Sequence, residues 1–374
     1  MEEHLMNPLL ELKALGQSIW LDYIQRGMLV NGDIKRMIDN DGLAGITSNP
    51  AIFEKAINSH HDYDQAISKL INQGADTLKI YETLALEDVG QAADLFRSVY
   101  AQTDGRDGYV SMEVSPHLAH NTEATIAEGQ RLWGLLKRPN IMIKVPATLE
   151  GLPAIQALIA AGVNINVTLL FGIERYQKVA DAYISGIQQR VNAKLPVNRI
   201  ASVASFFLSR IDSLIDHRLD KITLTNNKAH PLRGEAAIAS ARKAYQEYKI
   251  LFSGPRWKML SQHGARSQRL LWASTSTKEP AYSDVKYVEA LIGPDTVNTL
   301  PPQTLDAYRE HGRPALQLEK DLDKARALPD ALLALGIDIA DAAARLEVEG
   351  VEKFIAPYDN LLGTLARRRL LEAR

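Results

Sequence analysis

Eight short apolar stretches recur along the chain, and longer segments with helical spacing separate them. Each stretch is rich in Ile, Val, Leu and aromatic residues, which is typical of strands buried on both faces of a sheet. Strands that alternate with helices indicate βαβ units and a parallel sheet, and eight of them predict a closed (β/α)8 TIM barrel of the α/β class. The predicted strands are Ser18–Ile24, Gly45–Asn49, Tyr109–Val114, Ile141–Pro146, Asn164–Phe171, Ile200–Phe207, Leu270–Thr275 and Val297–Leu300.

A doubly wound sheet is the alternative fold for this pattern. Such a sheet normally carries a glycine-rich turn, G-x-G-x-x-G, directly after its first strand, where the turn binds a phosphate. Here the residues after the first stretch read Gln25-Arg26-Gly27-Met28, which lacks that motif. The barrel is therefore favoured.

The length of 374 residues would ordinarily suggest more than two domains. Because α/β barrels often run beyond about 200 residues as one unit, we expect a single domain over 1–374, with helical insertions at about 51–108 and 209–268 and a helical tail from about 317. The tail could cover an active site or form a contact in a homo-oligomer, and the sequence leaves both open. Its predicted helices are Gln317–Leu328, Asp330–Leu335, Ile337–Glu347 (capped by Asp338) and Gly350–Leu371.

The composition restricts the chemistry. The chain has no cysteine, so disulfides, thiolate metal sites and cysteine nucleophiles are excluded. A formal net charge of -2 gives no general reason to expect binding to nucleic acid or to an acidic membrane surface. Neither a signal peptide nor a membrane helix is evident. We therefore expect a cytoplasmic protein that needs no metal or cofactor and acts through lysine, histidine, carboxylates and hydroxyls.

Lys144 is the most informative polar residue, because it lies inside the apolar stretch Ile141–Pro146. A buried ammonium is unfavourable, and lysine is almost never fully buried without a partner. A desolvated lysine is also the nucleophile that forms a Schiff base with a carbonyl. The alternative is a structural ion pair with Glu113 or Asp22. Because acids occur on the first and third predicted strands, we favour the catalytic interpretation.

Schiff-base chemistry needs proton transfer as well as an amine. Glu113 and Asp22 offer two carboxyl groups for general acid and base steps, and Thr168 could hold a water between acid and imine. Asn49 and Asn166 can bond substrate hydroxyls. Each also has a structural alternative: Asn49 precedes Pro50 and suits a turn, and threonine is an ordinary strand residue.

Two cations follow the sixth and seventh predicted strands. Arg210 and Lys278 would suit a phosphate at the barrel mouth, with Ser205, Ser274 and Ser276 as neutral donors. The alternative for each cation is a solvated surface charge.

At this point the motifs together resemble the transaldolase family, in that family's order and each on its own predicted strand or strand end. The final motif is similar to the longer bacterial branch of the family. The motifs are Trp20-Leu21-Asp22, Gly45-Ile46-Thr47-Ser48-Asn49-Pro50, Ser111-Met112-Glu113-Val114, Ile143-Lys144-Val145-Pro146-Ala147-Thr148, Asn166-Val167-Thr168-Leu169-Leu170-Phe171, Ser209-Arg210-Ile211-Asp212 and Trp272-Ala273-Ser274-Thr275-Ser276-Thr277-Lys278.

The resemblance implies a metal-independent enzyme that moves a dihydroxyacetone unit from a ketose phosphate to an aldose phosphate in the non-oxidative pentose phosphate pathway. The ketose would be sedoheptulose 7-phosphate or fructose 6-phosphate, and the acceptor glyceraldehyde 3-phosphate or erythrose 4-phosphate. It implies that Lys144 forms the Schiff base and that Asp22 takes the C4 hydroxyl proton. Glu113 would act through a water held by Thr168.

The resemblance further implies that Asn49 and Asn166 orient the dihydroxyacetone unit and that Ser205 and Arg210 bind phosphate. Shorter family members have a second phosphate-binding arginine after the seventh strand, where this chain offers Lys278. Lysine supplies the charge without the bidentate fork. Two other functions remain open: a simple class I aldolase of the fructose 6-phosphate aldolase type, and a non-catalytic barrel that only binds.

Overall fold

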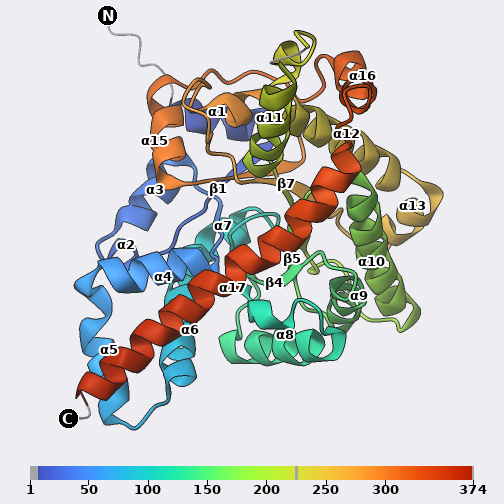
Figure 1. Ribbon diagram of the computed structural model, residues 1–374. Helices are drawn as coiled ribbons and strands as arrows, with labels where there is room; N and C mark the ends of the chain where they lie inside the picture. Colours follow the sequence, from blue (N-terminus) through green and yellow to red (C-terminus); the bar gives the residue numbers. More distant parts are fainter. Residues whose placement is uncertain (1–6, 224–225, 373–374) are drawn as a thin grey trace, which may run out of the picture.

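The computed structural model describes residues 7–223 and 226–372, and in them eight parallel strands form a closed barrel. The strands follow one another around the barrel in chain order, and the last pairs with the first, Gln17 lying opposite Thr296. This confirms the predicted TIM barrel (Figure 1). The strands are β1 (Gln17–Leu21), β2 (Gly45–Ile46), β3 (Tyr109–Glu113), β4 (Ile141–Pro146), β5 (Ile165–Leu170), β6 (Ser202–Phe207), β7 (Arg269–Ala273) and β8 (Thr296–Leu300).

Six strands are shorter than the sequence predicted, and two of these differences bear on the site. β1 ends at Leu21 and β2 at Ile46, so Asp22 and Asn49 lie just beyond the strands. The predicted strands are too long because the predicted stretches continue beyond the last residues that pair with a neighbouring strand. The shortening places both side chains at the carboxyl ends of the strands, where barrel enzymes carry their chemistry.

Helices surround the barrel and bury an apolar layer against it. β4 is buried throughout. α9 covers β4 and β5, and α10 covers β5 and β6, with Ile155, Leu158 and Tyr176 among their buried side chains. The helices are α1 (Pro8–Ala14), α2 (Arg26–Val30), α3 (Asp33–Asp41), α4 (Pro50–Ser59), α5 (Asp64–Asn72), α6 (Thr77–Leu95), α7 (Arg97–Gln102), α8 (Thr122–Leu136), α9 (Gly151–Ala161), α10 (Ile173–Asn192), α11 (Ser209–Thr223), α12 (Ala236–Leu251), α13 (Pro255–Ser261), α14 (Lys286–Ala290), α15 (Pro302–His311), α16 (Leu322–Leu333) and α17 (Ile339–Glu372).

The two long connections are helical, as the sequence predicted. The first holds α4 to α7 with a 3-10 turn, η1 (His61–Tyr63), and the second holds α11 to α13 with another, η3 (His230–Leu232). A third 3-10 turn, η2 (Pro116–Leu118), follows β3. None of the helices in residues 7–223 and 226–372 combines the length and the apolar character that crossing a bilayer requires.

The sequence predicted four helices in the tail, whereas the part of the tail that the structure describes has two, α16 and α17. α16 begins only at Leu322 and continues through Pro329, because Ala325, Leu328 and Leu332 bury one face of it. The predicted break between Ile337–Glu347 and Gly350–Leu371 is also wrong: α17 is one helix of 34 residues. The predicted cap is present, since the Asp338 carboxylate accepts a hydrogen bond from the Ala340 amide at 2.7 Å.

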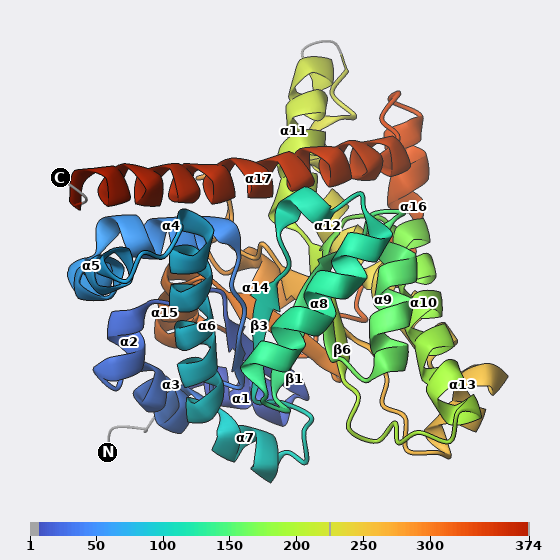
Figure 2. The same cartoon turned by 90° about the horizontal axis from the view of Figure 1, so that it is seen from below.

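α17 runs without a break through Gly350. A Cβ atom there would lie 3.1 Å from the Leu169 side chain, so the glycine lets the helix approach the end of β5 closely. α17 lies across one end of the barrel in both views and packs against α4, α6 and α11 (Figures 1 and 2).

Candidate active site

A small cavity of about 190 Å3 lies at the carboxyl ends of the strands. Most of the predicted site residues line it. The other three, Glu113, Asn166 and Thr168, lie on β3 and β5, the strands on either side of β4. The predicted residues in the wall are Asp22, Asn49, Lys144, Ser205, Arg210, Ser274 and Lys278.

Lys144 occupies the middle of a row that three neighbouring strands form. It pairs with Glu113 on β3 and with Asn166 on β5 in the parallel register. Its Nζ atom donates a hydrogen bond to the Ser48 carbonyl oxygen at 3.0 Å and lies 3.3 Å from a Glu113 carboxylate oxygen. The side chains of Lys144 and Glu113 are only 5% and 8% exposed, so the amine meets an acid in a site closed to bulk water.

Burial dominates the electrostatics of Glu113. Loss of water raises the pKa of its carboxyl to about 7, against the opposing charge of Lys144, and the negative charge of Asp22 adds to the rise. A carboxyl with this pKa can both give and take a proton near neutral pH.

Asp22 is held at the cavity wall by the Thr47 hydroxyl. The Thr47 hydroxyl donates to the Asp22 carboxylate at 2.7 Å and lies 2.7 Å from the hydroxyl of Thr299. Burial raises the pKa of Asp22, and the charge of Lys144 opposes that rise. Asp22 therefore has a fixed orientation and an increased affinity for a proton.

Asn166 is oriented by hydroxyls on both sides. Its amide nitrogen donates to the Ser111 Oγ at 3.0 Å, and its carbonyl oxygen accepts from the Ser205 Oγ at 2.6 Å. Ser205 lines the cavity and is thereby linked to Asn166.

Thr168 lies opposite Pro146 in the β4–β5 register, and its hydroxyl is fully buried. Within residues 7–223 and 226–372 that hydroxyl has no hydrogen-bond partner. Buried hydroxyls are normally paired with protein or with an ordered water. The position is thus suited to holding a water.

Asn49 serves the structural role that its sequence context also allowed. It is the N-cap of α4, and its side-chain oxygen accepts from the Ile52 amide at 3.0 Å. It also lines the cavity, so the cap fixes a polar side chain at the rim.

The two predicted phosphate cations face the same cavity. The Arg210 guanidinium lies 5.4 Å from the Phe207 ring centroid, and burial lowers its pKa. Burial also lowers the pKa of Lys278, and the charge of Arg210 adds to this effect. The charge of Arg210 is therefore unfavourable to the charged form of Lys278, and an anion near both cations would relieve this.

The serines near these cations join the ends of β6 and β7. The Ser209 and Ser274 hydroxyls lie 2.8 Å apart, and the Ser209 amide donates to the Ser274 carbonyl at 3.1 Å. Ser274 has a left-handed φ of 55°, which turns the chain sharply after β7. Lys278 donates to Ser276 at 2.8 Å and so stays near the rim.

Sequence reasoning missed two lining residues from the tail, Lys353 and Phe354 of α17. Their helix follows the barrel in the chain, and amphipathic spacing does not reveal where a helix docks. Thr47, which donates to Asp22, and Thr299, which bonds to Thr47, were also missed as site residues. No group of three or more potential metal-ligating side chains occurs in the part of the chain that the structure describes.

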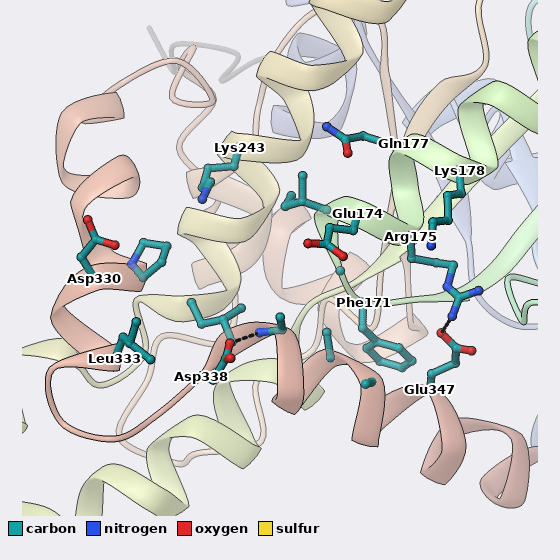
Figure 3. Close-up of a pocket in the computed structure, with 17 residues that line it drawn as sticks. Phe171, Glu174, Arg175, Gln177, Lys178, Lys243, Asp330, Leu333, Asp338 and Glu347 are labelled. Carbon is teal, nitrogen blue, oxygen red and sulfur yellow. Dashed lines mark hydrogen bonds and ion pairs between the residues drawn. The ribbon is translucent and has the colours of Figure 1, made fainter.

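A second, larger cavity of about 460 Å3 lies between α10, α12, α16 and α17 (Figure 3). None of the predicted site residues lines it. Beside it, the Arg175 guanidinium of α10 lies 3.1 Å from the Glu347 carboxylate of α17, and this ion pair joins the tail to the barrel.

Comparison with known proteins identifies the family. Residues 19–365 match the family model described as Transaldolase/Fructose-6-phosphate aldolase. The chain belongs to this family. It is 48% identical to a transaldolase of Trichodesmium erythraeum and 47% identical to one of Frankia alni, over 97% of both chains in each comparison. It is also 44% identical to a transaldolase of Thiobacillus denitrificans, over 96% of this chain and all of that protein.

Family membership agrees with the motif resemblance. The family's description names two activities, transaldolase and fructose-6-phosphate aldolase. The sequence predicts the same TIM barrel for both, and the two activities differ in what accepts the three-carbon unit. The relatives just described carry the transaldolase name, and their similarity extends through the tail.

Proposed function

We propose that this protein is a transaldolase that transfers a dihydroxyacetone unit through a Schiff base on Lys144. The observation that carries the proposal is the enclosed Lys144 amine, 3.3 Å from Glu113, at the wall of a cavity that three further cations, Arg210, Lys278 and Lys353, also line. The full-length similarity to transaldolases supports the same assignment.

The reaction begins when the neutral Lys144 amine attacks the C2 carbonyl of a ketose phosphate such as fructose 6-phosphate or sedoheptulose 7-phosphate. The carbinolamine then loses water to give an iminium. Glu113 supplies the proton for the departing hydroxyl, either directly or through a water held by Thr168.

Cleavage follows from the iminium, which accepts the electrons of the breaking C3–C4 bond. Asp22 takes the proton of the C4 hydroxyl, the aldose phosphate leaves, and a three-carbon enamine remains on Lys144. Addition of this enamine to a second aldose phosphate, such as erythrose 4-phosphate or glyceraldehyde 3-phosphate, reverses the steps and forms the new ketose. Asn49 and Asn166 would orient the three-carbon unit.

The phosphate of donor and acceptor would lie between Arg210 and Lys278. Both cations line the cavity, and the charge of Arg210 lowers the pKa of Lys278, which supports this role because an anion would stabilise both charges. Ser205, Ser274 and Ser276, which line the same cavity, would add neutral donors. We further propose that the chain forms one domain and works in the cytoplasm, without metal, cofactor, nucleic acid or membrane, and that any oligomer is a homo-oligomer.

Two measurements test the function. Borohydride reduction in the presence of fructose 6-phosphate should leave a covalent adduct on Lys144, and the Lys144→Met variant should form none. Fructose 6-phosphate should turn over rapidly only when erythrose 4-phosphate is supplied. Equal turnover without an acceptor would assign a simple aldolase, and absence of any adduct would leave a binding protein.

A further inference from the structure

The tail helix α17 brings an aromatic side chain to the reactive amine. The Phe354 ring centroid lies 5.6 Å from the Lys144 Nζ atom, and Phe354 lines the same cavity as Asp22 and Arg210. The side chain is 5% exposed. Lys144 therefore has carboxyl groups on the strand side and an apolar ring on the tail side.

The position of α17 is fixed on both sides of Phe354. Toward its amino end, Gly350 packs closely on Leu169, and Glu347 pairs with Arg175 of α10 at 3.1 Å (Figure 3). Toward its carboxyl end, the rings of Tyr358 and Tyr81 meet edge to face with centroids 5.4 Å apart. The helix thus spans the barrel mouth as a packed element, seen from the side in Figure 2.

A transaldolase must keep the enamine intact until the acceptor arrives, and water competes at that stage. Protonation of the enamine carbon converts it to an iminium. Addition of water to the imine carbon and breakage of the C–N bond then release dihydroxyacetone and restore the amine. One water is lost when the imine forms and one is consumed when it is hydrolysed. The net result is therefore simple aldol cleavage of the ketose phosphate, which is the aldolase reaction.

We propose that Phe354 covers the Schiff base and excludes water from it, so that α17 makes the site favour transfer over release of dihydroxyacetone. An apolar ring offers no hydrogen bond to an attacking water, and its face stabilises a neighbouring cation such as the iminium. The inference rests on the proposed transaldolase function and extends it to a tail residue that lies outside the barrel strands.

The test measures, for fructose 6-phosphate, the ratio of dihydroxyacetone released without acceptor to three-carbon units transferred to erythrose 4-phosphate. Phe354→Ala should raise this ratio about tenfold, and Phe354→Leu should raise it less because leucine keeps part of the cover. Borohydride should still trap the adduct on Lys144 in both variants. Leu361→Ala is the matched control, because Leu361 lies two turns further along α17, is buried and does not line the cavity.

The outcomes separate the inference from the function on which it rests. A wild-type protein with no acceptor-dependent transfer contradicts the transaldolase assignment itself. If the wild-type protein does transfer the unit, an unchanged ratio in Phe354→Ala contradicts the proposed role of Phe354 as a cover. An equal increase of the ratio in Leu361→Ala contradicts it as well, because the ratio would then depend only on how the tail docks. If Phe354→Ala does not fold, a Phe354→Leu ratio no higher than that of the control overturns the inference.

Discussion

The amine nitrogen of Lys144 lies 3.3 Å from a carboxylate oxygen of Glu113, and the barrel encloses both side chains. The two residues are register partners on β3 and β4, so the sheet itself fixes their separation. A nucleophilic amine needs to be neutral, whereas an acid catalyst needs its proton. This contact places the acid beside the amine on which it acts, which connects the pH dependence of the reaction to Glu113.

We predict that imine formation slows as the pH rises above about 7, the pKa to which burial raises Glu113. Its protonated form supplies the acid for loss of water, and the population of that form falls about tenfold for each pH unit above the pKa. The rate of adduct trapping by borohydride, measured from pH 5 to 9 with fructose 6-phosphate, checks this.

Glu113→Gln should slow imine formation by about 10²–10⁴-fold and abolish the decline above neutral pH. Glu123→Gln, a change at an exposed position on α8, should keep the wild-type profile. Persistence of the same decline in Glu113→Gln would assign it to another group.

Asp22→Asn should separate cleavage from imine formation. The amide keeps the shape of the side chain and an oxygen that can accept from Thr47, but it cannot take the C4 hydroxyl proton. Transfer to erythrose 4-phosphate should fall about 10²–10⁴-fold, while borohydride still traps fructose 6-phosphate on Lys144. Loss of trapping in parallel with transfer would contradict the assigned step.

The barrel and the placement of Glu113, Lys144 and Asn166 on three successive strands could be predicted because they depend on short-range pattern. A charged residue inside an apolar strand is visible in the sequence, and parallel strands bring their carboxyl ends together whatever their separation along the chain. Their exact hydrogen bonds, such as Ser205 to Asn166, depend on register and could not be predicted.

The tail could not be placed from its sequence for a different physical reason. Gly350 looks like a helix break when read alone, since glycine lowers helix propensity. In the fold it is the point where α17 touches Leu169, and the contact that favours glycine there is tertiary. Phe354 is an ordinary buried aromatic in the helix pattern, and only the docked helix shows that it reaches Lys144.

Phosphate binding should depend more on Arg210 than on Lys278. Loss of a charge-assisted hydrogen bond costs about 1.5–3 kcal/mol, so Arg210→Gln should raise the KM for fructose 6-phosphate about ten- to a hundredfold. Lys278→Gln should raise it less, because lysine lacks the bidentate fork. Steady-state kinetics with fructose 6-phosphate and with fructose give the comparison. An equal loss with unphosphorylated fructose would show that these residues do not recognise phosphate.

The last prediction concerns stability at the opposite end of the barrel. The Arg269 guanidinium lies 2.9 Å from the Asp107 carboxylate, which also accepts from the Ser18 hydroxyl at 2.7 Å and the Trp20 indole at 3.2 Å. Asp107→Ala leaves a buried cation unpaired and should lower the free energy of unfolding by about 3–5 kcal/mol. Denaturant titration measures this, and kcat at a temperature where the variant stays folded should be unchanged because the cavity lies at the other strand ends.

The double variant Asp107→Leu with Arg269→Met is the control for that stability effect. It removes both charges together and should recover a large part of the lost free energy, because the cost arises from the uncompensated charge more than from the missing contact. A single-variant loss below about 1 kcal/mol would place this pair in the range of exposed ion pairs. Equal losses in the single and double variants would instead assign the effect to packing around Trp20, which shares the Asp107 carboxylate.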